Sequence, residues 1–109
     1  MYRVAYPAAV PAMYQFKVRE GARRISVACS WEGMGNINFK IISPEKSFSE
    51  KELLVRERTD IDVKNGVSVY HGFKEVSLEI KPPAKKEENW TLELGISNIV
   101  EYRLSIEVS

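Results

Sequence analysis

The chain is poor in the residues on which redox and metal chemistry most often depend. Among its 109 residues are one cysteine, Cys29, one histidine, His71, and one glutamine. A single cysteine excludes an internal disulfide, and a single histidine excludes a histidine-rich metal site. The net charge is also small, because 16 basic and 15 acidic residues leave a formal charge of +1. This balance provides no general field that would attract nucleic acid or an anionic membrane.

Long hydrophobic runs are missing as well. No apolar stretch approaches the roughly 20 residues that a membrane-spanning helix needs. The N-terminal stretch is moderately apolar, but Pro7 and Pro11 interrupt it. It therefore lacks the hydrophobic region of a signal peptide. We expect an extracytoplasmic location if the chain is a domain cut from a longer protein, and a cytoplasmic one otherwise. Abundant Glu and Lys beside one glutamine is a composition found in thermophiles.

The strongest positive signal is an alternation of apolar and polar residues, which is typical of β-strands with one buried face. The alternation recurs around residues 14–18, 25–31, 37–41, 61–63, 67–69, 76–80, 90–96 and 102–108. Asn65-Gly66 lies between two of these runs and predicts a tight hairpin, because both turn positions require positive φ. Residues 47–58 are ambiguous: Ser49 and Glu52 could open a short helix as a capping box. We favour a loop followed by a strand from about Leu53.

Seven or eight short strands separated by turn signals predict an all-β fold, an antiparallel β-sandwich. Residues 14–109 are expected to form this single domain, and residues 1–13 an N-terminal extended arm. The arm is expected to lie along the sheet as packing or to contact a neighbouring domain. Trp31 and Trp90 fall on the apolar faces of their strands, so we expect both in the core.

Several of these strands together resemble a known family. Tyr14 to Val18, the Glu20-Gly21 turn, Asn36 to Ile41 before Ser43-Pro44, and Trp90 to Leu94 are similar to the strand motifs of pre-peptidase C-terminal domains and related P-domain-like jelly rolls. The resemblance implies an eight-stranded jelly roll without catalytic residues of its own, which assists a neighbouring protease domain and often carries structural calcium. Where that family has aspartates, this chain has Asn36 and Asn38, and Glu45 replaces a glycine.

One set of oxygen-bearing side chains is a candidate calcium site. Calcium prefers six to eight oxygen ligands, including carboxylates. Glu32, Asn36 and Asn38 flank a glycine-containing loop, and Asp60 and Asp62 could approach it from elsewhere. The alternative interpretation is a simple connection, in which Gly33 and Gly35 permit the turn and the asparagines accept local backbone bonds. We favour the connection, and we treat Asp60 and Asp62 first as solvated edge charges.

These observations favour a non-catalytic accessory or interaction domain that contacts another protein or a neighbouring domain, with no cofactor required. Tyr2, Tyr6, Tyr70 and Phe73 stand outside the main alternation and are the predicted contact residues. The first alternative is a carbohydrate-binding module that stacks sugars on surface aromatics. The second is a small hydrolase, which would need a pocket joining His71 to a carboxylate.

Overall fold

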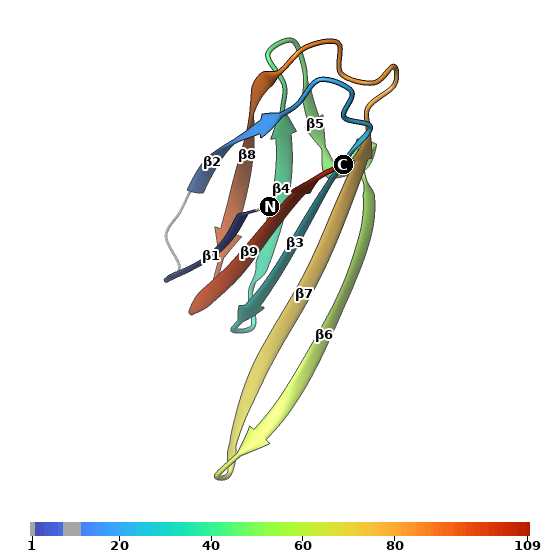
Figure 1. Cartoon of the computed structure of the whole chain (residues 1–109). Coiled ribbons are helices and arrows are strands. Elements are labelled where there is room, and N and C mark those ends of the chain that lie inside the picture. The colour runs from blue at the N-terminus through green and yellow to red at the C-terminus, as the bar shows by residue number, and fades with distance from the viewer. Residues whose placement is uncertain (1, 8–11) are drawn as a thin grey trace.

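The computed structural model is a two-layer antiparallel β-sandwich (Figure 1). It describes the backbone of residues 2–7 and all of residues 12–109. Nine strands are described in these ranges: β1 (Tyr2–Pro7), β2 (Ala12–Val18), β3 (Arg24–Glu32), β4 (Asn36–Ile42), β5 (Ser47–Ser49), β6 (Leu54–Lys64), β7 (Val67–Glu79), β8 (Glu88–Ser97) and β9 (Glu101–Val108). A single 3₁₀ turn, η1 (Glu50–Glu52), precedes β6.

Eight of these strands form two four-stranded sheets in jelly-roll order. One sheet has the order β1-β9-β3-β7, the other β2-β8-β4-β5, and β6 is added beside β7 at the edge of the first. Except for the pairs β4–β5 and β6–β7, strands that follow one another in the chain therefore lie in different sheets. The all-β sandwich predicted from the alternation is confirmed.

The core lies between the sheets and consists of the inward-facing residues of both. Buried residues alternate along each central strand: β3 contributes Ile25, Val27, Cys29 and Trp31, and β8 contributes Trp90, Leu92, Leu94 and Ile96. Burying a large apolar side chain stabilises the fold by about 1.5–3 kcal/mol. Trp31 and Trp90 are each only 6% exposed, which confirms their expected place in the core.

Residues 47–58 contain the strand expected from about Leu53, which is β6 from Leu54, but part of the expected loop is the short strand β5. Helical structure there is limited to the one 3₁₀ turn, and Ser49 makes no side-chain capping bond. The backbone of residues 2–7 lies along one edge of the five-stranded sheet, where it pairs antiparallel with β9 as strand β1.

The hairpin of β6 and β7 distinguishes this sandwich from a minimal jelly roll. Its strands have 11 and 13 residues, and Figure 1 shows them running well past the rest of the molecule. The chain measures 54 × 23 × 22 Å, with a radius of gyration of 14.9 Å. A compact domain of this length would have a radius of gyration of about 13 Å. The hairpin accounts for the elongation.

No helix in residues 2–7 or 12–109 is both long and apolar enough to cross a membrane.

Candidate functional site

Within the part of the chain that the structure describes, no layer covers the section of the hairpin that projects beyond the sandwich. β3 accompanies β7 only as far as the pair Glu32–His71, so residues 61–70 form a two-stranded ribbon, here called the hairpin extension. Asn65 and Gly66 close it with φ of 52° and 77°, the left-handed values that the predicted turn requires. The hairpin prediction is thus confirmed, but the uncovered length of the ribbon was not predicted.

Apolar side chains occupy both faces of the hairpin extension. Ile61, Val63 and Val67 are exposed to 61%, 69% and 61%. In the hairpin register, Ile61 lies opposite Tyr70 on the face that continues the core, and Val67 lies opposite Lys64 on the other face. An isolated two-stranded ribbon is marginally stable in water, and clustered exposed apolar groups indicate contact surfaces. The hairpin extension is therefore the strongest candidate for a functional surface among the described residues.

A buried ionic network fastens the base of the hairpin to the sandwich. Lys74 of β7 is 2% exposed, and its ammonium donates a hydrogen bond of 2.8 Å to the carbonyl oxygen of Ile37 in β4. It also forms an ion pair of 3.2 Å with Glu50 of η1, and Glu57 of β6 lies 3.6 Å away. Glu50 in turn accepts a hydrogen bond of 2.7 Å from the backbone N–H of Phe39. One buried cation thereby links both strands of the hairpin to the opposite sheet.

Close packing of Trp31 on Gly72 completes this base. A Cβ atom at Gly72 would lie 2.1 Å from the nearest indole carbon, so only glycine admits the ring at this position. The indole thus lies against the backbone of β7 close to the point where the hairpin leaves β3. Because the base is packed and ion-paired, the hairpin extension is held in a defined direction.

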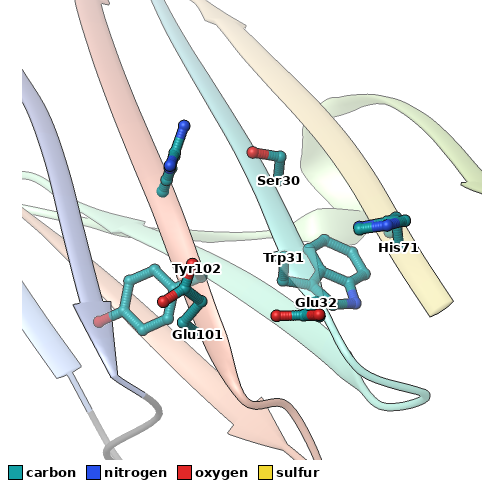
Figure 2. Close-up of a pocket in the computed structure, with 8 residues that line it drawn as sticks. Ser30, Trp31, Glu32, His71, Glu101 and Tyr102 are labelled. Atoms are coloured by element: carbon teal, nitrogen blue, oxygen red, sulfur yellow. The ribbon is translucent and has the colours of Figure 1, made fainter. Parts of the chain in front are cut away.

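A shallow cavity of about 280 Å³ lies on the outer face of the five-stranded sheet. Figure 2 shows that Glu101, Glu32 and His71 line it from three neighbouring strands, β9, β3 and β7. The side chain of His71 lies 3.3 Å from a carboxylate oxygen of Asp62, so the hairpin brings a histidine and a carboxylate together. Ser30 also lines the cavity, but among residues 12–109 no hydrogen bond joins its hydroxyl to His71.

Cys29 is excluded from chemistry at this surface by its position. It faces the core at 1% exposure, and burial raises the pKa of its thiol to about 12. A thiol with so high a pKa is almost entirely protonated near neutral pH, and the thiolate is the nucleophilic form. The only cysteine therefore acts as a small core residue.

The five predicted calcium ligands do not meet in one place. Asn36 and Asn38 lie on the outer face of the four-stranded sheet, where the amide of the first donates to the second over 3.4 Å. Glu32, Asp60 and Asp62 lie on the outer face of the other sheet or of its hairpin. Within the part of the chain that the structure describes, no cluster of three or more acidic, histidine or cysteine residues could hold a metal ion. The Gly33–Gly35 loop connects β3 of one sheet to β4 of the other.

The predicted contact residues are divided as well. Tyr70 and Phe73 lie on opposite faces of the hairpin, and the ring of Phe73 is covered by the guanidinium of Arg58 at 5.0 Å. The side chains of Tyr2 and Tyr6 lie outside the described residues, although their backbones belong to β1. Sequence reasoning missed Lys74. Extending the alternation of Val76 and Leu78 two residues back would have placed Lys74 on the inward face.

Comparison of the chain with models of protein families, with curated proteins and with solved structures finds no match.

Proposed function

We propose that this protein is a non-catalytic interaction domain whose hairpin extension contacts another protein chain. The observation that carries the proposal is the projecting ribbon with exposed Ile61, Val63 and Val67, held at its base by the buried Lys74 network. A ribbon that was only a loose loop would need no such anchor. A defined direction reduces the ordering cost of binding, because less freedom is lost on association.

The chemistry at the outer cavity favours binding over catalysis. The histidine has Asp62 beside it, but the thiol is buried and protonated, and Ser30 makes no hydrogen bond to the imidazole within the described residues. Activation of a nucleophile by a general base requires the two groups to lie within hydrogen-bond reach. The domain is therefore proposed to work through its surface alone.

The carbohydrate-binding alternative finds less support. Sugar stacking needs exposed aromatic faces. Trp90 is buried and stacks on Phe48 with ring centroids 6.2 Å apart, and among residues 12–109 none of the strongly exposed large hydrophobic side chains is aromatic. The resemblance to pre-peptidase C-terminal domains stays a prediction, and it agrees with an accessory role.

Site-specific photocross-linking tests the proposal. A photoreactive amino acid is placed at Val63 in the hairpin extension, and at the exposed Glu45 in the β4–β5 loop as the control. In cells that produce the protein, Val63 should give cross-linked adducts with a protein chain, whether a second copy or another protein, and Glu45 should not. If Val63 gives no adduct, or both positions give the same ones, the hairpin extension is not the contact surface.

A further inference from the structure

The outer edge of β6 is a long strand edge that has no neighbouring strand among the described residues. β6 is the last strand of its sheet, and its register with β7 runs unbroken from Leu54 to Lys64. Lys64 and Val67 flank a two-residue turn and so form the first hydrogen-bonded pair of the hairpin. It follows that even-numbered residues of β6 bond to β7. The odd-numbered residues direct their N–H and C=O groups to the free edge.

Protected edges carry prolines, bulges or charges that hinder pairing. β6 has neither proline nor an interruption of its register, but it is highly charged. The order of these charges is unusual: Arg56 and Arg58 precede Thr59, and Asp60 and Asp62 follow it. The two arginines are therefore mirrored about Thr59 by the two aspartates, whereas Glu57 and Lys64 are mirrored by the uncharged Ile61 and Leu54. With this order of charges, an antiparallel copy of β6 is attracted, because its aspartates face the arginines of the first copy.

We propose that β6 pairs antiparallel with β6 of a second copy of the chain, so that the two-fold axis passes between the two copies of Thr59. This inference rests on the proposed function and names the partner. In this register Arg58 lies opposite Asp60 of the second copy, and Arg56 lies opposite Asp62. The symmetry repeats each pair, so four cross-strand pairs of opposite charge form on one face. Opposite charges in directly facing positions stabilise a strand pair, and like charges destabilise it.

Neighbouring registers lack this complementarity. Directly facing residues of an antiparallel pair lie on the same face of the sheet. The two-fold axis perpendicular to the sheet therefore passes midway between the two copies of one residue of β6. Centring the axis on Arg58 sets two arginines against each other. Centring it on Asp60 sets two aspartates together and brings Arg56 opposite Lys64. Only the register centred on Thr59 places every arginine and aspartate opposite a residue of the other sign and overlaps the full length of both strands; Glu57 and Lys64 then face the uncharged Ile61 and Leu54.

The same register satisfies the free backbone groups and covers apolar surface. Residues 55, 57, 59, 61 and 63 of each copy fall in hydrogen-bonded pairs, which supply about ten hydrogen bonds across the interface. Val63, 69% exposed, lies beside Val55 of the second copy, and Val55 packs against the core. Each hairpin extension thus runs along the base of the other hairpin. Such strand addition is a recognised mode of protein association.

Light scattering on purified full-length protein tests the proposal with charge-exchanged variants. The acidic variant carries Arg56→Asp and Arg58→Asp, and the basic variant carries Asp60→Arg and Asp62→Arg. All four side chains are exposed, so both variants should keep the wild-type circular dichroism spectrum. The wild type should have twice the mass of one chain and dissociate on dilution. Each variant alone should be monomeric, because all four arginine–aspartate pairs become pairs of like charges.

An equimolar mixture of the two variants should recover the doubled mass, because every aspartate of one chain then faces an arginine of the other. A wild type that stays monomeric at high concentration would overturn the proposal. So would variants that dimerise alone, or a mixture that stays monomeric. These results leave the proposed function standing if Val63 still cross-links to a different protein, so the two can fail separately.

A Thr59→Cys variant tests the register itself. Facing residues in a hydrogen-bonded antiparallel pair have Cα atoms about 5.5 Å apart, which is within the range that a disulfide spans. Mild oxidation should therefore link two copies through position 59, and a Glu45→Cys variant should stay unlinked. Buried Cys29 does not compete. If Thr59→Cys links no faster than Glu45→Cys, the axis does not pass through Thr59.

Discussion

Replacing Lys74 with methionine should destabilise the sandwich, because it removes the cation from a buried ionic network. The side chain of Lys74 is 3% exposed and that of Glu50 is 25% exposed. Breaking a buried pair by removing one partner costs about 3–5 kcal/mol. Glu50 keeps some solvent and its bond from Phe39, so the lower part of this range applies. The pair with Glu57, whose side chain is 65% exposed, adds less than about 1 kcal/mol.

We therefore expect Lys74→Met to lower the free energy of unfolding by about 3 kcal/mol. For a domain of this size the midpoint of thermal unfolding should fall by about 12 °C. Urea unfolding followed by tryptophan fluorescence measures the change, because both tryptophans are buried. Lys17→Met, at an exposed lysine of β2, is the matched control and should stay within about 0.5 kcal/mol of the wild type.

Glu50→Gln distinguishes loss of the ion pair from simple loss of packing, because the sign of its effect on the free energy of unfolding should depend on whether Lys74 is present. Glu50→Gln should destabilise the wild type, since it weakens the partner of a buried cation. In the Lys74→Met background it should be neutral or stabilising, since it then removes an uncompensated buried carboxylate. The reasoning is refuted if Lys74→Met is as mild as Lys17→Met, or if Glu50→Gln costs the same in both backgrounds.

Three further predictions follow from local structure. Gly35→Ala should destabilise the fold by more than about 2 kcal/mol in urea unfolding, because its Cβ would lie 1.6 Å from a backbone oxygen, whereas Gly95→Ala, with nothing nearer than 3.8 Å, should be nearly neutral. Cys29 should resist thiol reagents at pH 8 and react only on unfolding, and rapid labelling of native protein would contradict the raised pKa. Hydrogen bonding and charge from Lys81 lower the pKa of Glu79; Lys81→Ala should raise this pKa toward its usual range, measured by NMR titration.

The sequence was informative about the fold because burial leaves a direct trace in the alternation of side chains. Ile25 to Trp31 and Trp90 to Ile96 alternate because each strand has one face in the core. Asn65-Gly66 predicted its turn for an equally local reason, the positive φ of both residues. Where local geometry determines the outcome, a single sequence suffices.

The candidate site could not be predicted in the same way, because it depends on contacts between strands that are distant in the sequence. Ile61 and Val63 alternate like buried residues, although nothing in the described structure covers them. Glu32 and Asn36 are near neighbours in the chain, but the loop between them crosses from one sheet to the other and separates their side chains. Both outcomes depend on which strands lie opposite each other, and this is determined by the whole fold.

The place of β3 in its sheet has a consequence for how the molecule folds. β3 lies between β7 and β9, and both of these strands come far later in the chain. The backbone groups of β3 can be paired only after long loops have closed. Closing these loops costs conformational entropy before the stabilising contacts form. Chains dominated by such distant pairings fold on a timescale of about milliseconds to seconds. During that interval the early strands expose their apolar faces. Every newly synthesised chain goes through this exposed state before β7 and β9 can pair with β3.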